Sequence, residues 1–469
     1  MPRKLNRQTA PTTRRPIKIL QFGEGNFLRA FCDWMVDVLN EKTDFNGNVQ
    51  VVQPIGQGMG AMINAQDGLY HVVLNGIMGG AKISKDRLIT CIESVLNPYE
   101  DYEKFLALGE NPDLRFIFSN TTEAGIAFNE FDTTHARLPN SFPGKVTALL
   151  YHRFQFFKGS ASSGLTFLPC ELIEKNGTNL KSVVERYIDL WKLPVEFRTW
   201  LNANVHFCNT LVDRIVPGFP KETIQEIHRR TGYEDNLAVM AEPFHLWVIE
   251  APESVRQSLP LEKAGLQVKF VPDLTPYRTR KVRILNGAHT TLVPVAYLKG
   301  LRTVRDSVDD KEVGAYLLSA IHEEIIPTLD LPESELRRFA DEVMERFQNP
   351  FIKHELASIA LNSISKYKVR VLPSVLGYIS SRKELPKRLL YSLAALIRFY
   401  KGEWKGERLP VNDTPEILEF FKKAWITNDP VYAAKVVLGN EEFWGVDLNG
   451  YHGLNKYVTE TLKEIELSW

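Results

Sequence analysis

The sequence has few cysteines and no segment suited to crossing a membrane. Its four cysteines, Cys32, Cys91, Cys170 and Cys208, lie far apart and form no Cys-x-x-Cys pair. This spacing argues against a disulfide framework and favours a reducing, cytoplasmic setting. No run of about 18 apolar residues occurs, so we expect no transmembrane helix and no membrane partner. Residues 1–16 are basic, lack the apolar core of a signal peptide and are expected to form a frayed tail.

An excess of charge of one sign is also missing. Lys and Arg total 57, and so do Asp and Glu, which argues against nucleic acid as the main partner. The ten histidines form no His-x-His or His-Glu-x-x-His pattern, so the sequence predicts no metal site. With 469 residues, 44% of them hydrophobic, the chain is expected to fold into two or three domains.

The first pattern of interest is a strand that runs into a glycine turn. Ile17–Phe22 has the composition of a short strand, Gly23-Glu-Gly25 follows, and a helical pattern then continues to about Leu39. Backbone amides at such a helix start hold the pyrophosphate of a dinucleotide. The third glycine of the usual Gly-x-Gly-x-x-Gly is missing, because Leu28 stands there. Taken alone, the pattern fits a structural strand–helix turn equally well.

Strands and helices alternate through the first half of the chain. Further strands are expected at 49–54, 115–119 and 165–169, and helices at 144–157 and 179–191. This alternation predicts a mainly parallel, doubly wound α/β sheet.

Two loops of this expected sheet lie where a ligand could bind. The loop 120–125 follows a strand, where such sheets place ligands. The strand at 49–54 ends without the acidic residue that binds a ribose hydroxyl, and no Lys or Arg occurs from Val51 to Tyr70. The choice between NAD and NADP therefore stays open, and the missing cation favours NAD.

From about Thr275 the apolar residues recur at helical spacing, and strand alternation is scarce. We therefore expect a first domain over 1–274 and a mostly helical domain over 275–469. The basic segment Ser363–Arg370 is expected to join two helical stretches and could reach a substrate anion, although a solvated basic loop fits it as well. Helices are expected at about 309–326, 333–347, 351–363, 385–401, 413–426 and 453–466.

Three polar residues able to handle protons stand in an apolar stretch of the second half: Lys281, Asn286 and His289. At about 100° per residue, Asn286 and His289 share one face of a helix and Lys281 lies further round. Lys281 can join the other two only by stretching, or if the helix begins irregularly. Each of the three residues taken singly also fits a structural role.

A third pattern is the pair Asp213-Arg214, which lies between apolar residues of the segment 205–217. Such a pair fits a buried, hydrogen-bonded ion pair that shapes a site wall. An exposed charge pair is the alternative.

Taken together, these segments resemble the polyol-specific long-chain dehydrogenases, the mannitol dehydrogenase family. The pattern Val-x-Phe-x-x-Thr-x-Val-Asp-Arg-Ile-x-Pro of 205–217 is similar to that family's signature. The segment Pro276 to His289 matches its catalytic segment, and Gly23-x-Gly25-x-Phe27 resembles its altered cofactor turn. The resemblance implies an N-terminal Rossmann-like α/β domain, a mostly α-helical C-terminal domain, and metal-independent hydride transfer with NAD.

The resemblance also implies roles for individual residues. Lys281 would be the general acid/base, with its pKa lowered by desolvation or by Arg280 and Arg283, while Asn286 and His289 would polarise the reacting oxygen. Lys366, Arg370, Asp213 and Arg214 are the expected substrate-binding residues. The cofactor-binding residues would be Gln21, Phe22, Gly23, Glu24, Gly25, Asn26, Phe27, Arg29, Asn120 and Thr121.

Within the family, the chain resembles the hexuronate branch in three segments: 21–30, 169–172 and 349–356. The mannitol enzymes typically have Cys-Asp-Asn-Leu where this chain has Cys170-Glu-Leu-Ile173, so Leu172 replaces an oxyanion donor. The expected substrate is therefore a small open-chain sugar acid. The alternatives are another ketouronate such as fructuronate, a neutral polyol, or a catalytically silent sugar-acid-binding protein. The sequence leaves the oligomeric state open.

Overall fold

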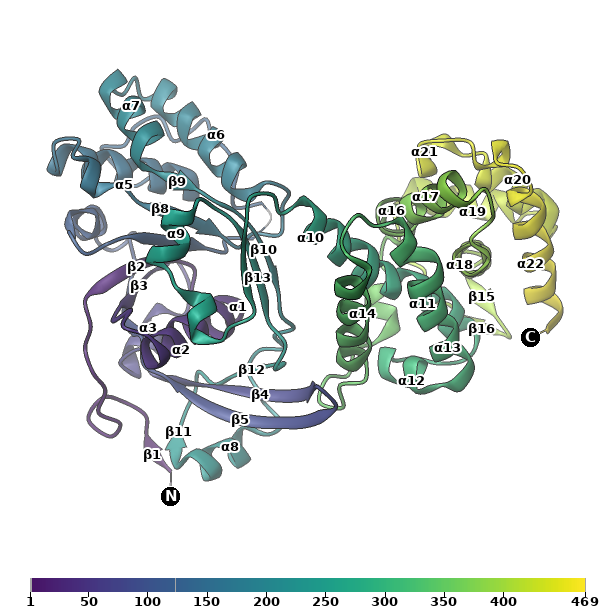
Figure 1. Ribbon diagram of the computed structural model, residues 1–469, viewed down its shortest axis with the longest axis horizontal. Helices are drawn as coiled ribbons and strands as arrows, with labels where there is room; N and C mark the ends of the chain where they lie inside the picture. Colours follow the sequence, from purple (N-terminus) through teal and green to yellow (C-terminus); the bar gives the residue numbers. More distant parts are fainter. Residues whose placement is uncertain (1, 123, 469) are drawn as a thin grey trace. The chain divides into compact units, whose positions relative to one another are not determined.

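The computed structural model describes residues 2–122 and 124–468, and the chain divides into two compact units. Unit 1 extends to Asn75 and resumes from Lys82 to Leu274, while unit 2 takes Gly76–Ala81 and continues from Thr275. Unit 1 contains the larger sheets and unit 2 is mostly helical (Figure 1).

The centre of unit 1 is a six-stranded parallel sheet in the order β6-β3-β2-β7-β8-β9. This order confirms the predicted doubly wound sheet. The strand order reverses beside β2, so the carboxyl ends of β2 and β7 flank the switch point at which such sheets bind ligands. The strands are β2 (Ile17–Phe22), β3 (Asn48–Val52), β6 (Ile92–Leu96), β7 (Phe116–Ser119), β8 (Thr166–Pro169) and β9 (His206–Phe207).

Helices cover both faces of this sheet, because successive strand residues point to opposite sides. Ile19 of β2 packs in one apolar cluster with residues of the first helix, and Leu20 packs in another with the later helices (Figure 1). The first helix comprises α1 (Asn26–Leu28), the π-helical turn η1 (Arg29–Asp33) and α2 (Trp34–Lys42). The later helices are α5 (Phe142–Phe156), α6 (Asn176–Leu190) and α7 (Val195–Asn204).

Unit 1 also contains smaller sheets. One joins β10 (Asn209–Asp213), β13 (Leu246–Glu250) and β14 (Val268–Val271), another joins β12 (Val239–Ala241), β4 (Tyr70–Met78) and β5 (Ala81–Ile89), and a third pairs β1 (Arg3–Lys4) with β11 (Tyr233–Glu234). The remaining short helices are α3 (Gly60–Ala65), α4 (Tyr102–Ala107), η2 (Leu108–Glu110), η3 (Ala161–Ser163), α8 (Ile224–Thr231), α9 (Glu253–Ser258) and η4 (Leu261–Ala264).

The expectation of a frayed N-terminal tail is wrong for residues 3–10. β1 pairs in parallel with β11, and Leu5 is buried beside Leu69. Ala10 is 6% exposed in the same apolar cluster. The buried side chains of Leu5 and Ala10 hold the segment in place. The sequence interpretation missed them because the segment is mostly basic and polar.

Unit 2 is built from helices, as expected. The predicted helix over 333–347 is α14, and those near 385–401, 413–426 and 453–466 are present with shifted ends. The helices are α10 (Thr275–Arg280), η5 (Lys281–Asn286), α11 (Gly287–Leu298), α12 (Val304–Asp309), α13 (Lys311–Ser319), η6 (Ala320–Ile325), η7 (Ile326–Thr328), α14 (Glu333–Phe347), α15 (Leu356–Ile359), α16 (Ser363–Arg370), α17 (Leu372–Arg382), α18 (Lys387–Phe399), α19 (Pro415–Ala424), α20 (Pro430–Leu438), α21 (Glu441–Trp444), η8 (Leu448–Gly450) and α22 (Leu454–Ser468). A short hairpin, β15 (Glu403–Trp404) with β16 (Glu407–Arg408), follows α18.

Two expectations for unit 2 are wrong. The helix expected over 351–363 is reduced to α15, and the basic segment Ser363–Arg370, expected as a joining loop, is the helix α16. Asn362 has a φ of 51°, which ends the preceding turn in the left-handed region and starts α16 in a new direction. The chain therefore forms two short helices, α15 and α16, on either side of this residue.

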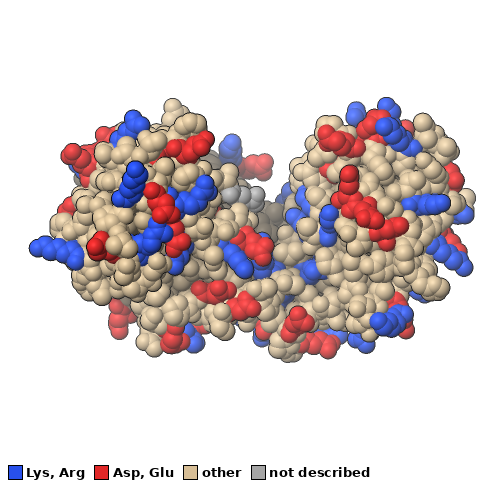
Figure 2. Space-filling model, turned by 90° about the horizontal axis from the view of Figure 1, so that it is seen from above, with Lys and Arg blue, Asp and Glu red and all other residues tan. Residues whose placement is uncertain are grey.

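On the face shown in Figure 2, basic and acidic side chains are interspersed over each unit, in agreement with the neutral net charge. Among the described residues, no helix is both long enough and apolar enough to cross a membrane.

Candidate active site

The glycine turn after β2 requires glycine at its first position. Gly23 has a φ of +123°, and a Cβ there would lie 2.9 Å from Leu28 Cδ1 and 3.3 Å from the Asn120 carbonyl oxygen. Gly25, by contrast, has no atom within 4 Å of the place of a Cβ. The turn thus brings the end of β2 against the end of β7 and leaves open space in front of the helix start at Asn26.

The cofactor-binding residues expected from the sequence divide into an exposed and a buried group. Gly25 and Asn26 are exposed, and Phe27, Asn120 and Thr121 are half-buried, so these five can touch a ligand. The other five shape the turn from below, and each is less than a tenth exposed: Gln21, Phe22, Gly23, Glu24 and Arg29.

Hydrogen bonds hold the turn from its buried side. Gln21 Nε2 donates to the Gly23 carbonyl at 3.1 Å, and Arg29 Nε donates to the Glu24 carbonyl at 3.1 Å. Arg29 Nη2 also donates to Asn26 Oδ1 at 2.8 Å. Burial lowers the pKa of the Arg29 guanidinium from its ordinary value. Gln21 and Arg29 therefore act on a ligand through the backbone that they fix.

Asp33, in η1, is a buried carboxyl that sequence reasoning missed. Its Oδ2 accepts hydrogen bonds from Gln21 Nε2 at 3.3 Å and from the Tyr70 hydroxyl at 3.1 Å. Burial raises the pKa of Asp33 to about 7, against the lowering effect of these two hydrogen bonds. An acidic residue inside an apolar helical pattern was the only available signal.

The loop after β7 is anchored by Glu171, which is 2% exposed. Its Oε1 accepts from the Thr121 amide at 2.9 Å and from Thr121 Oγ1 at 3.0 Å, while Oε2 accepts from Ser119 Oγ at 3.0 Å. Glu171 therefore positions the strand-end loop of the switch point. Its neighbour Leu172 is 60% exposed. Glu123, in the same expected loop, lies outside the described residues.

These residues fit a dinucleotide. The turn has the positive-φ glycine, the open space at Gly25 and a helix start, which are the features that a pyrophosphate site needs. The exposed segment 55–58 after β3 contains neither an acidic residue for a ribose hydroxyl nor a cation for a 2′-phosphate.

In unit 2, the residues expected to be catalytic lie on an irregular helix. Lys281–Asn286 forms the π-helical turn η5, and α11 begins at Gly287. Hydrogen bonds of a π-helix join residues five apart, so Lys281 comes closer to the face of Asn286 than a regular α-helix would allow. His289, three residues further in α11, shares that face. All three side chains are half-buried.

Gly287 allows α16 to approach this segment closely. A Cβ at Gly287 would lie 3.2 Å from the Arg370 carbonyl oxygen and 3.5 Å from the Val282 carbonyl oxygen. The approach brings two expected substrate cations, Lys366 and Arg370, onto a helix that packs against η5 and α11.

Basic groups gather on α16 and η5. Lys366 Nζ donates to the Ile359 carbonyl at 2.8 Å. Burial, together with the charge of Arg370, lowers the pKa of Lys366, and burial lowers the pKa of Arg370 and of Arg283. Cations held partly out of water in this way are suited to receive an anion.

His289 packs among rings. It stacks on Phe347 at 4.2 Å between centroids and meets the edge of His354 at 5.0 Å. Burial lowers the pKa of His354, which favours its neutral form. In the sequence, the segment 349–356 stood out only for its resemblance to the hexuronate branch, and the ring contact places its His354 beside His289.

Arg280, named as a neighbour that could lower the pKa of Lys281, is 4% exposed and ion-paired with Glu335 at 2.7 Å. Its guanidinium also lies 4.2 Å from the centre of the Phe339 ring. Glu335 therefore offsets the charge of Arg280, which weakens any effect of this arginine on the pKa of Lys281.

Asp213 and Arg214 are both buried in unit 1, so the surface alternative is wrong. Arg214 Nε donates to the Glu242 carbonyl at 2.9 Å, Nη1 donates to the Ala30 carbonyl at 2.7 Å, and the guanidinium lies over the Trp34 ring. Burial lowers the pKa of Arg214 to about 9. These contacts tie Arg214 to the helix that follows the glycine turn, and its substrate-binding role stays a prediction.

Comparisons with known proteins agree on one family. The model described as "Mannitol dehydrogenase Rossmann domain" matches residues 17–263, and the "Mannitol dehydrogenase C-terminal domain" model matches residues 273–466. The altronate oxidoreductase of Bacteroides thetaiotaomicron is 49% identical over 464 residues, which cover 98% of this chain and 97% of that protein. The altronate oxidoreductase of Bacillus subtilis is 48% identical over 455 residues, which cover 97% and 93%.

Two solved structures share the fold. A D-sorbitol dehydrogenase in substrate-free form superposes with a TM-score of 0.82 at 23% identity, over 99% of this chain and 98% of that one. A Pseudomonas fluorescens mannitol 2-dehydrogenase, in a ternary complex with NAD and D-mannitol, gives 0.68 at 21% identity, over 99% and 97%. The family models together span nearly the whole chain, and the expected fold class is confirmed. The chain belongs to the mannitol dehydrogenase family.

Proposed function

We propose that this chain is an NAD-dependent altronate oxidoreductase that interconverts D-tagaturonate and D-altronate. The observation that carries the proposal is identity of nearly one half, over almost the full length, to altronate oxidoreductases from distant bacteria. The intact set Lys281, Asn286 and His289 supports turnover, since a protein that only binds sugar acids has no need of a proton donor.

The cofactor proposal rests on the switch point of unit 1. The Gly23–Asn26 turn would hold the pyrophosphate, and the loop at Asn120 and Thr121 would border the rest of the dinucleotide. NAD is favoured over NADP because the exposed segment 55–58 has no cation for a 2′-phosphate. When bound, the nicotinamide supplies or accepts the hydride at its C4.

The chain itself must manage one proton and one developing negative charge. In the direction of reduction, Lys281 donates a proton from Nζ to the ketone oxygen as the carbon receives the hydride, and in oxidation it takes that proton back. Lys281 is half-buried, and a lysine can exchange a proton near neutral pH only where desolvation or a neighbouring cation lowers its pKa.

Asn286 and His289 would hold the reacting oxygen. Asn286 donates its side-chain N–H to the developing alkoxide, and His289 orients the same oxygen from one turn further along. The stack on Phe347 fixes the plane of the imidazole, so its hydrogen-bonding direction is set before substrate arrives. Leu172 offers no second donor at the place where mannitol enzymes have an asparagine.

The substrate carboxylate needs a cation, and α16 presents two. Lys366 and Arg370 lie on α16. This helix packs closely against the proposed catalytic segment because residue 287 is a glycine. Their partial burial strengthens an ion pair with a bound carboxylate, since water screens it less. A cytoplasmic setting is proposed as well, supported by four free, buried thiols.

The test is oxidation of NADH in the presence of D-tagaturonate, D-fructuronate or D-fructose, each repeated with NADPH. We expect the highest kcat/KM with tagaturonate and NADH. A preference for fructuronate or fructose would support the proposed hydride transfer but show that tagaturonate is not the preferred substrate. No turnover with any of the three would favour a binding protein.

A further inference from the structure

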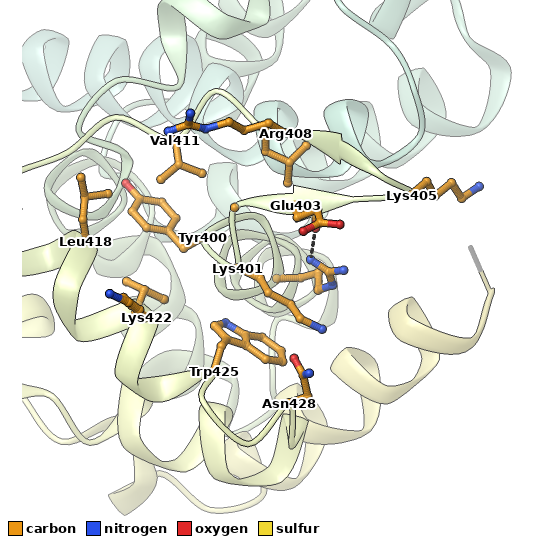
Figure 3. A pocket seen from close by; sticks show the side chains of 14 residues that line it. Tyr400, Lys401, Glu403, Lys405, Arg408, Val411, Leu418, Lys422, Trp425 and Asn428 are labelled. Carbon is orange, nitrogen blue, oxygen red and sulfur yellow. Dashed lines mark hydrogen bonds between the residues drawn. The ribbon is translucent and has the colours of Figure 1, made fainter.

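A pocket in unit 2 shares no residue with the site described above. It has a volume of about 640 Å³, within the roughly 300–1,000 Å³ typical of small-molecule sites. Its walls come from the end of α18, the β15–β16 hairpin and α19 (Figure 3). The lining residues are Arg398, Tyr400, Lys401, Gly402, Glu403, Lys405, Arg408, Leu409, Val411, Leu418, Phe421, Lys422, Trp425 and Asn428.

Hydrogen bonds and ion pairs fix the frame of the pocket. Arg398, whose side chain is 6% exposed, pairs with Glu466 at 2.6 Å and donates to the Glu403 carbonyl at 2.8 Å. Trp425 Nε1 donates to the Ile397 carbonyl at 3.1 Å, and Lys401 Nζ lies 4.9 Å from the centre of the Trp425 ring. The pocket is therefore preformed, which lowers the entropic cost of binding.

Positive charge exceeds negative charge around this hollow. Five lining residues are lysine or arginine and one, Glu403, is acidic, although the whole chain is neutral. Arg398 and Lys401 share the single carboxylate of Glu466. This local excess of positive charge favours the binding of an anion.

Two of the cations are available to a ligand. Arg408 is exposed and has no ion-pair partner within the described part of the chain. Lys422 is exposed, and its nearest carboxylate, in Glu419, is 4.0 Å away, at the outer limit of an ion pair. In Figure 3, Arg408 and Lys401 border the hollow with Trp425 and Tyr400, whereas Lys405 extends away from it.

We propose that this pocket binds a small phosphate monoester of about the size of a sugar phosphate. A phosphate monoester carries about −1.5 to −2 charges and three acceptor oxygens, so several separate cations can bind it at once. A carboxylate carries one charge and satisfies fewer of them. The side chains of Val411 and Leu418 supply apolar surface for the carbon part of the ligand.

The test is calorimetric titration of the full chain with D-glucose 6-phosphate, D-glucose, inorganic phosphate and D-galacturonate at constant ionic strength. We expect saturable binding of D-glucose 6-phosphate and weaker binding of the other three. The double variant Arg408→Ala/Lys422→Ala should raise the Kd by about tenfold or more. The matched control is Lys423→Ala, because Lys423 is also exposed and lies 3.8 Å from Glu419 but does not line the pocket.

Three outcomes would overturn the proposal. They are the absence of saturable D-glucose 6-phosphate binding, D-galacturonate binding that is equally tight and equally weakened by the double variant, and equal weakening by Lys423→Ala and the double variant. Because the titration measures heat and not turnover, its result is independent of whether the chain reduces tagaturonate. Both substituted residues are exposed, and an unchanged melting temperature would verify that the variants fold.

Discussion

At the scale of single residues, the strongest claim concerns Lys281. Lys281→Ala should lower kcat by about 10²- to 10⁴-fold, the usual contribution of a positioned acid or base. Lys281→Arg is the matched control, since it keeps the positive charge but cannot release a proton near neutral pH. Steady-state assays across pH would show a lower, flatter profile for both variants. If Lys281→Ala kept full turnover, Lys281 would not be the general acid/base.

Asp33 gives a prediction on pH. Its pKa is raised from 3.8 to about 7 in the folded chain, so folding favours the protonated carboxyl. The stabilisation is present below about pH 4 and is lost as the pH rises to about 7, on the order of 4 kcal/mol in all. Asp33→Asn removes this loss, because the amide does not ionise.

The measurement is chemical unfolding of the wild type and of Asp33→Asn at pH 5 and at pH 8. The unfolding free energy of Asp33→Asn relative to that of the wild type should be larger at pH 8 than at pH 5. Glu41→Gln is a suitable control, since Glu41 is exposed and the pKa of its carboxyl is lowered by Lys42 and Arg87. A difference that is the same at both pH values would show that Asp33 does not titrate in this range.

At the scale of elements, the sequence predicted the strand–turn–helix pattern, the parallel sheet and several helix positions, because hydrophobic periodicity records them directly. The π-helical form of Lys281–Asn286 left no such record, and the spacing of Lys281 and Asn286 allowed either a stretched lysine or an irregular helix. Ser363–Arg370 was expected as a loop, since its charges masked Ile364 and Tyr367, which are buried in α16.

Contacts between distant segments account for the other differences. Nothing near Glu171 in the sequence points to Ser119 and Thr121, which meet it only because β7 and β8 are neighbours in the sheet. The pairing of His289 with His354 depends in the same way on the packing of unit 2. Motifs therefore located the candidate site, and the residues that position it needed the structure.

Gly287 provides the prediction at this scale. In Gly287→Ala, the new methyl group meets the Arg370 carbonyl at 3.2 Å, so α16 must shift away from the catalytic segment. We expect a loss of stability of about 1–3 kcal/mol, together with a raised KM for the sugar acid, because α16 carries Lys366 and Arg370. Unfolding and steady-state kinetics would measure the two effects.

Gly377→Ala is the matched control in α17, where the nearest atom to a new Cβ, Thr328 Cβ, lies at 3.4 Å, an ordinary contact. That helical substitution should be neutral or stabilising, by up to about 1 kcal/mol. If both variants behaved alike, the close approach of α16 would not explain the glycine in the catalytic segment.

At the scale of the whole molecule, the two units differ in the chemical groups that they offer to a ligand. Unit 1 supplies backbone amides and open space at a sheet switch point, and unit 2 supplies ionisable side chains on packed helices. A dinucleotide that binds the folded chain must stabilise it by mass action, by about 2.7 kcal/mol at 100 times its Kd. Binding can thus be followed without turnover, from the melting temperature alone.

Gly25 and Gly23 separate cofactor binding from folding in that experiment. Gly25→Ala places a methyl group in space that no other residue occupies, so the melting temperature of the ligand-free chain should stay unchanged. The same methyl group would stand where the pyrophosphate is proposed to lie, and the rise in melting temperature with NADH should be largely lost. Gly23→Ala should lower the melting temperature even without ligand, since its φ of +123° strains any other residue and its Cβ would clash with Leu28. If NADH raised the melting temperature of Gly25→Ala as much as that of the wild type, the pyrophosphate would not bind at this turn.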